Sequence, residues 1–212
     1  MLRFSLVSIL LWLWGVTAGA QVFTVDTISD AVFLRMQGKS YRNDCTVPRS
    51  DLRYLQVSHF DANGKLCRGE LVCNKLIAND LIEIFKEFYR QRYPIEQMRL
   101  IDDYDADDER SMQANNTSCF NFRASAGSKK LSKHSLGLAI DINPLYNPCV
   151  RRRKDGSLSV QPAAGRSYAN RRGNHVPYRI EEGDLCHRLF REHGFVWGGA
   201  WRSLKDYQHF ER

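Results

Sequence analysis

Two stretches of this 212-residue sequence carry side chains that bind metal ions and move protons. The stretch "SKHSLGLAID" holds His134 and Asp141, and "WGGAWRSLKDYQHFE" holds His209, with Asp206 three positions before it. Two imidazoles and one carboxylate form a common ligand set for catalytic zinc, which leaves the fourth coordination position to water. A single histidine or aspartate is more often exposed or partnered in the core, so only the combination points to a metal site.

The residues between His134 and Asp141 are small and apolar. We expect His134 on a turn that enters a strand ending at Asp141, with Gly137 and Ala139 keeping the intervening backbone slim. Small residues would let two polar ligands converge on one ion against a packed sheet. The spacing alone does not identify a peptidase.

The order of these motifs resembles a known family. Ser-x-His-x-x-Gly-x-Ala-x-Asp, followed by Asp-x-x-His-Phe, is similar to the zinc D-alanyl-D-alanine carboxypeptidases of the VanY and VanX types and to the L-alanyl-D-glutamate endopeptidases. The subgroup with Gly-Gly-x-Trp before the last histidine is the most similar, and residues 198–201 read Gly-Gly-Ala-Trp. Further similarity in "RMQGKSY", "DLRYL", "GELVCN", "NNTSCFNFR" and "DINPLYNP" extends the resemblance over about residues 33–212.

The resemblance implies a ligand set and a general base. His134, Asp141 and His209 would hold one zinc ion, which lowers the pKa of its bound water toward about 7. Asp206 would take the proton of that water and deliver it to the leaving amine. The alternative role for Asp206 is to orient a ligand histidine, which is a frequent arrangement around metals.

The resemblance also implies residues that contact the substrate. Arg123 matches an arginine that stabilises negative charge on the carbonyl oxygen, although it could instead form a structural ion pair with the acidic stretch at 102–109. Ser132 matches a serine that contacts the substrate. Trp201 is expected in the substrate groove, with core packing as the alternative.

These roles predict a secreted zinc metallopeptidase that acts on the peptide stem of peptidoglycan. Removal of terminal D-alanine and cleavage inside the stem both remain open. The alternative is a non-catalytic zinc-binding cell-wall or signalling module, since Hedgehog signalling domains share the fold that the resemblance implies. Glycoside cleavage is disfavoured because no pair of acids stands out for it.

The first twenty residues predict a signal peptide. Arg3 precedes an apolar run over about residues 4–16, and Ala18-Gly19-Ala20 suits cleavage near Ala20. The run is shorter than the roughly 18 to 20 residues that span a bilayer, so we expect no stable membrane insertion. The mature protein is expected to be secreted or periplasmic.

The charge distribution and the cysteine content bear on the binding partners and on disulfide formation, respectively. The formal net charge is +7, but the basic residues are mostly scattered, so no nucleic-acid partner is expected; the oligomeric state is not predicted. Six cysteines in an oxidising compartment favour disulfides, although Cys67 and Cys73 on one strand would lie about 20 Å apart, too far to pair.

Local patterns predict the elements that must position these residues. Asn63-Gly64 between 54–60 and 66–74 indicates a β-hairpin, and apolar residues at helical spacing predict a helix over about 78–92. Short strands are expected at 98–101, 118–122, 138–143 and 195–197, a solvated acidic loop at 102–109, a surface excursion at 147–177 and a helix at 182–193.

The elements are interspersed without a regular βαβ rhythm, which favours an α+β fold. We expect one domain with a small, mostly antiparallel sheet flanked by helices, like that of the Hedgehog domains and D,D-peptidases. Within it, residues 21–75 would form an N-terminal segment packed on a catalytic region at 76–212.

Overall fold

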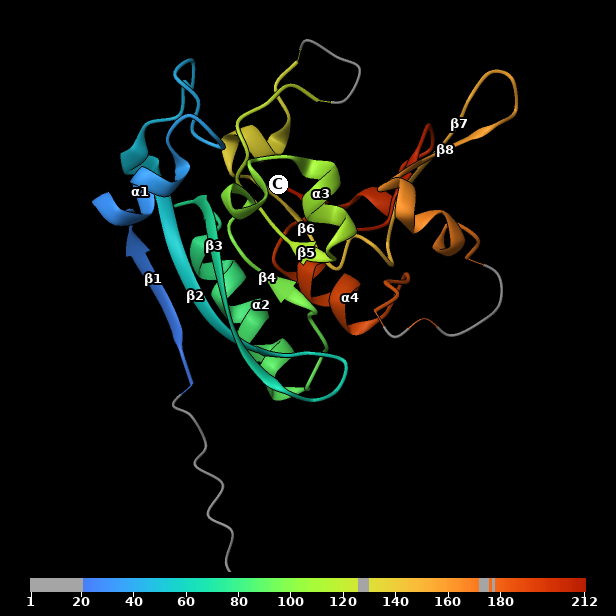
Figure 1. Cartoon of the computed structure of the whole chain (residues 1–212). Helices are drawn as coiled ribbons and strands as arrows, with labels where there is room; N and C mark the ends of the chain where they lie inside the picture. Colours follow the sequence, from blue (N-terminus) through green and yellow to red (C-terminus); the bar gives the residue numbers. More distant parts are fainter. Residues whose placement is uncertain (1–20, 126–129, 172–175, 177) are drawn as a thin grey trace, which may run out of the picture.

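The computed structural model describes residues 21–125, 130–171, 176 and 178–212 of an α+β protein (Figure 1). The signal peptide expected at residues 1–20 lies outside the described residues. None of the helices in the described ranges is both long and apolar enough to cross a bilayer. The α-helices are α1 Asp30–Met36, α2 Ala78–Arg90, α3 Asp108–Gln113 and α4 Leu185–Glu192. Short 3-10 turns are η1 Arg49–Asp51, η2 Ile101–Tyr104, η3 Lys133–Leu136, η4 Ala163–Tyr168 and η5 Gly198–Ala200.

The largest sheet is formed by three N-terminal strands in the order β1-β2-β3, all antiparallel. They are β1 Phe23–Thr27, β2 Leu52–Phe60 and β3 Leu66–Asn74. The turn between β2 and β3 places Gly64 at φ +74°, a conformation that glycine adopts without steric cost. The predicted hairpin is therefore confirmed.

Helix α2 lies against one face of this sheet (Figure 1). Its apolar stripe packs into a core that also contains Leu55 and Leu71 from the sheet and Phe190 from α4. The expected stripe residues are all buried: Ile77, Leu81, Ile84, Phe85 and Phe88. The helix and its role in core packing are confirmed, with its end two residues earlier than expected.

A second sheet of very short strands has the order β6-β11-β9. These are β6 Ala139–Asp141, β11 His209–Glu211 and β9 Val196–Trp197. Phe210, in the central strand, is fully buried and its ring stacks on that of Phe190, with 4.2 Å between the centroids. Packing against α4 therefore holds this sheet on the same core as the hairpin.

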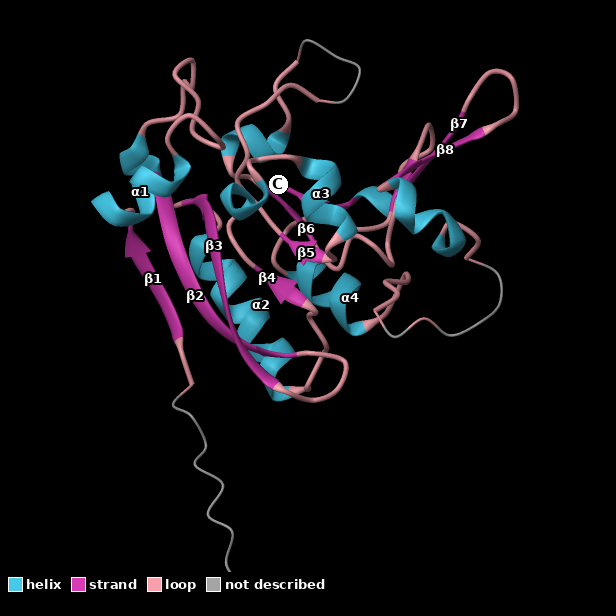
Figure 2. Cartoon of the chain, viewed as in Figure 1, coloured by secondary structure: helices cyan, strands magenta, loops and turns pink. Residues whose placement is uncertain are grey.

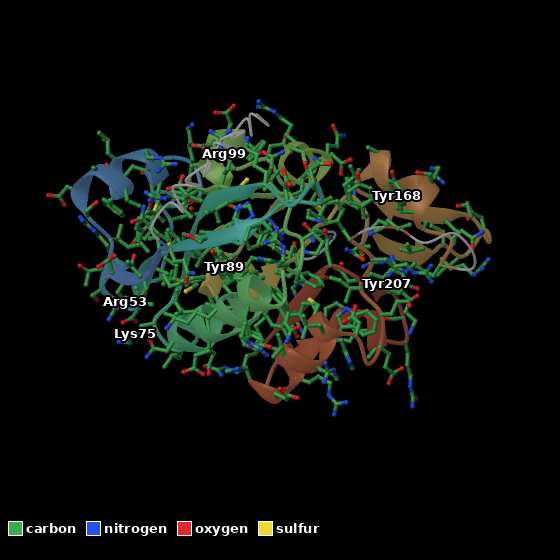
Figure 3. All side chains as sticks on the ribbon, turned by 90° about the horizontal axis from the view of Figure 1, so that it is seen from below. Arg53, Lys75, Tyr89, Arg99, Tyr168 and Tyr207 are labelled. Carbon is green, nitrogen blue, oxygen red and sulfur yellow. The ribbon has the colours of Figure 1, made fainter. Side chains whose placement is uncertain are left out.

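The third sheet has the order β10-β7-β8 and extends from the C-terminal half of the molecule (Figure 2). Its strands are β10 Lys205–Asp206, β7 Cys149–Arg152 and β8 Leu158–Gln161. The surface excursion expected at 147–177 thus contains an antiparallel hairpin that the turn-rich composition concealed. Tyr168 and Tyr207 lie in this half, on the opposite side of the molecule from Arg53 and Lys75 (Figure 3).

The region between α2 and the site is less regular than expected. Only β4 Gln97–Met98 and β5 Asn116–Thr117 pair, in parallel, so the strands expected at 98–101 and 118–122 are wrong in their bounds. The buried Asn116 side chain explains the break, because its Oδ1 accepts a hydrogen bond from Arg99 N at 2.8 Å in place of a strand partner. The acidic stretch is not simply a solvated loop either, because Asp102 is buried and accepts from Ser40 N at 3.0 Å.

All six cysteines, which lie in described parts of the chain, are free thiols, so the expected disulfides are absent from this structure. Three of them, Cys73, Cys119 and Cys186, are buried in the core, where burial raises the thiol pKa. Cys67 and Cys73 stand near opposite ends of β3, as the strand argument required.

Candidate metal centre

His134 lies on the 3-10 turn η3, which is fixed at both ends. Ser132 Oγ accepts a hydrogen bond from His134 N at 3.2 Å and caps the start of the turn. Gly137 ends it at φ +66°, where a Cβ would lie 2.6 Å from Asn74 N. The glycine therefore allows the turn to pack directly on β3, and Asn74 N donates to its carbonyl at 2.9 Å. This confirms the need for a slim backbone beside His134.

Asp141 and His209 face one another across the antiparallel pair β6–β11. Residues directly opposite in such a pair point to the same face of the sheet. His209 Nδ1 lies 3.0 Å from Asp141 Oδ1, although the two residues are 68 positions apart in the sequence. The backbone ladder thus sets the separation of two candidate ligands.

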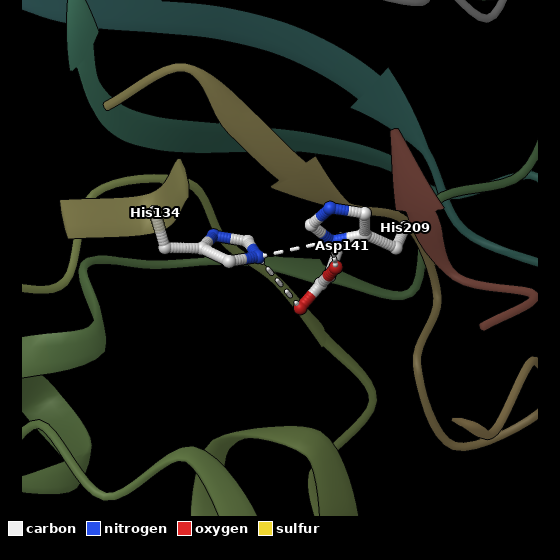
Figure 4. Close-up of side chains that lie close together, drawn as sticks. All are labelled: His134, Asp141 and His209. Carbon is white, nitrogen blue, oxygen red and sulfur yellow. Dashed lines mark hydrogen bonds and ion pairs between the residues drawn. The ribbon is translucent and has the colours of Figure 1, made fainter. Parts of the chain in front are cut away.

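The third candidate ligand completes the cluster (Figure 4). His134 Nε2 lies 3.2 Å from His209 Nδ1 and 3.3 Å from Asp141 Oδ2. One ligand atom from each of the three buried residues lies within 4.8 Å of the others. This group could hold one metal ion, as the sequence predicted.

The ring nitrogens that face away from the cluster also have partners. His134 Nδ1 donates to the carbonyl oxygen of Cys119 at 2.6 Å, and His209 Nε2 donates to Glu211 Oε2 at 3.1 Å. Such outer contacts fix the tautomer and leave the inner nitrogen free to bind a metal. Glu211 was not among the predicted site residues, although it lies two residues after His209 on one strand and therefore on the same face.

The electrostatics of the cluster favour a cation. Burial alone would raise the pKa of Asp141, but the two histidines hold it far below its ordinary value. Burial alone would lower the pKa of His209, but hydrogen bonds to Asp141 and Glu211 raise it to about 10. The carboxylates therefore favour positive charge at this position, which a bound metal ion would also provide.

The cluster opens into a cleft of about 380 Å³. Its lining contains all the residues that the sequence analysis assigned to the site: Arg123, Ser132, His134, Asp141, Trp201, Asp206 and His209. The fold thus brings together residues from three separate stretches of the chain.

Asp206 lies on β10, directly opposite Cys149 of β7. Its Oδ1 is buried and has no hydrogen-bond partner among the residues that the structure describes. Burial raises the pKa of Asp206 to about 6, and the neighbouring His209 opposes this shift. A carboxyl group with a pKa near neutrality can both accept and return a proton.

The expected substrate-contacting residues have other contacts as well. Arg123 Nε forms an ion pair with Asp108 of the acidic stretch, which was the alternative role considered for it. Arg123 also lines the cleft. Ser132 Oγ is engaged with the backbone of the turn. The Trp201 ring lies 5.2 Å from the His209 ring, between centroids, and so covers one side of the cluster.

Comparison with known proteins adds one finding. Residues 126–212 match the D-alanyl-D-alanine carboxypeptidase family. This range is less than half of the chain, but it includes the three candidate ligands and Asp206, while Arg123 precedes it. No curated protein and no solved structure matches the chain.

Proposed function

We propose that the chain is a zinc-dependent peptidase that hydrolyses a peptide bond in the stem peptide of peptidoglycan. The observation that carries the proposal is the convergence of His134, Asp141 and His209 on one wall of a cleft that also contains Asp206. Two imidazoles and a carboxylate suit zinc with an open coordination position. The family match over residues 126–212 supports a peptide substrate.

Asp206 suits the role of the general base. Zinc held by the three ligands would lower the pKa of a coordinated water toward about 7 and so supply the nucleophile. With a pKa of about 6, Asp206 is mostly ionised at pH 7 and can take a proton from the attacking water. It can then pass the proton to the leaving amine.

Arg123 suits the role of a positioned cation. Its ion pair with Asp108 holds the guanidinium at the edge of the cleft. A fixed planar cation there would stabilise negative charge that develops on the carbonyl oxygen of the substrate. The proposal includes export from the cytoplasm, which is supported by Arg3, the apolar run and the Ala18-Gly19-Ala20 sequence.

The direct test is digestion of purified peptidoglycan by the purified protein, with and without a chelator. We expect soluble or shortened stem peptides in mass spectra, loss of activity with the chelator and recovery when zinc is added. Loss of single terminal residues would identify a carboxypeptidase, and internal fragments an endopeptidase. Undiminished digestion in the chelator would contradict the metal dependence.

Asp206→Asn tests the general base while keeping the shape of the side chain. We expect a loss of kcat of about 100-fold or more with zinc content unchanged. Asp155→Asn, which changes an exposed carboxylate bonded to Ser157 far along the hairpin, is the matched control. Full activity of Asp206→Asn would refute this role, and zinc binding by wild-type protein without hydrolysis would support the non-catalytic module instead.

A further inference from the structure

One face of the β7–β8 hairpin continues the wall of the cleft beyond Asp206. Asp206, Cys149 and Gln161 lie directly opposite one another on β10, β7 and β8, so their side chains share a face. Arg151, two residues after Cys149 on β7, shares the same face. All four residues line the cleft, which confirms that this face of the hairpin points toward it.

The cations that line this cleft differ in whether they are paired. Arg123 is paired with Asp108, and Lys133 Nζ donates to the carbonyl oxygen of Arg212 at 3.2 Å. The Arg151 side chain is exposed and forms no hydrogen bond or ion pair with another described residue. Its charge is therefore available to a ligand in the cleft.

A second cation lies farther out on the same face. Arg153 Nη2 donates to Ser159 Oγ at 3.3 Å, and Ser159 stands opposite Arg151 in the hairpin. Two successive cations along an open hairpin suit the binding of a peptide whose chain continues past the site. A single cation in a closed pocket would instead suit the terminal carboxylate of a peptide.

We propose that Arg151 is a specificity residue that binds an in-chain carboxylate of the peptide substrate, outside the scissile bond. The proposal rests on the proposed peptidase function and names the chemistry of its substrate. Arg151 lies two residues along β7 from the Cys149–Asp206 pair, about 7 Å at 3.3 Å per residue, so the bound carboxylate belongs to a residue removed from the cleaved bond. The planar guanidinium suits a carboxylate because it can donate two parallel hydrogen bonds.

The other face of the hairpin provides a matched control. Arg152 points away from the cleft face, and its Nη1 donates to the carbonyl oxygen of Gly156 at 3.2 Å. Arg152→Gln removes the same charge from the same strand as Arg151→Gln. Both residues are exposed, so both variants should keep the wild-type unfolding temperature.

The test uses three synthetic stem peptides: one with every carboxylate free, one with only the in-chain carboxylates converted to amides, and one with only the C-terminal carboxylate converted. We expect wild-type protein to cleave the free peptide about fivefold faster in kcat/KM than the in-chain amide, the upper range for an exposed ion pair. Arg151→Gln should abolish this preference, and Arg152→Gln should keep it.

Two outcomes would overturn the proposal. One is that Arg151→Gln still cleaves the free peptide about fivefold faster than the peptide with in-chain amides. The other is that Arg151→Gln changes only the cleavage of the peptide with the converted C-terminal carboxylate. If wild-type protein cleaves none of the peptides, the peptidase function fails separately. Calorimetric binding of the first two peptides then tests Arg151, and equal affinities for wild type and Arg151→Gln would refute its role.

Discussion

The two sheets that share the core are assembled in different ways. Strands β2 and β3 pair over nine residues each and are joined by a short turn. Strands β6 and β11 pair over three residues each, and their facing residues Asp141 and His209 are 68 positions apart. The hairpin sheet is thus specified by neighbouring sequence, whereas the sheet that carries the ligands depends on distant packing.

The β1-β2-β3 sheet and the β6-β11-β9 sheet therefore differ in what stabilises them. A three-residue strand pair has too few hydrogen bonds to be stable alone, so β6 and β11 need the aromatic packing of α4 and the surface of the hairpin sheet. Changes at the contacts between the two sheets should therefore weaken metal binding as well as stability. Changes within the β2–β3 hairpin should affect stability alone. Three predictions concern the contacts that hold the ligands in place, and a fourth tests the carboxylate beside them.

The largest effect is expected from Phe210→Ala in β11. Loss of this buried ring should lower the free energy of unfolding by about 3–5 kcal/mol and weaken zinc binding by the folded protein, because the flanking His209 and Glu211 lose their anchor. Urea unfolding and zinc titration measure the two effects. Leu55→Ala in β2 should destabilise by about 2–5 kcal/mol without changing zinc affinity. Equal zinc affinity in both variants would contradict the claim that only the β6-β11-β9 sheet couples core packing to metal binding.

Gly137→Ala tests the contact between η3 and β3. The added methyl group would meet Asn74 N at 2.6 Å in a backbone with φ +66°, so we expect a loss of about 3 kcal/mol together with weaker zinc binding. Gly156→Ala, at φ +83° with open space around the new carbon, isolates the backbone strain and should cost about 1 kcal/mol. Thermal unfolding of the two variants should differ clearly; similar losses would argue against close packing at Gly137.

Glu211→Gln removes the charge that faces His209 Nε2 and keeps the shape. Outer partners of metal ligands change affinity by about 10- to 100-fold, and we expect a loss in that range from competition with a zinc-binding dye. The exposed Glu192→Gln should leave zinc affinity unchanged. A wild-type affinity in Glu211→Gln would show that this contact does not tune the ligand.

The pH dependence of kcat/KM tests Asp206. Burial raises the pKa of Asp206 to about 6 in the metal-free protein, and a bound cation would lower it. The carboxylate required as a base is therefore lost at or below pH 6, where activity should drop about tenfold for each further pH unit. The metal-loaded protein should be followed from pH 8 to 4.5, with zinc content checked at each point. An acid limb that is unchanged in Asp206→Asn would rule out Asp206 as its source.

The regular parts of the fold were predictable because their signals are local. The Asn63-Gly64 turn signal between residues 54–60 and 66–74 predicts the hairpin, and the apolar stripe of α2 predicts the helix. The strands around residues 98–122 were not, because Asn116 and Asp102 bury polar side chains that replace strand hydrogen bonds. Such replacements depend on tertiary partners that a single sequence does not show.

The ligand set was predictable through the resemblance, and the structure brings His134, Asp141 and His209 together. The catalytic roles of Asp206 and Arg123 stay predictions, supported by their place in the cleft. The hairpin at 149–161 was missed because its strands are only four residues long and lie among turn-forming residues. The cysteines are free although disulfides were expected, because an even number of cysteines makes pairing possible without requiring it.

The pairing of β11 with β6 makes the identity of the site depend on register. Side chains alternate along a strand, so a slip of a single residue would turn His209 to the opposite face and place Gln208 or Phe210 opposite Asp141. Neither can replace a ring nitrogen. Correct alignment of three residues at the end of the chain therefore decides whether this protein has a metal centre at all.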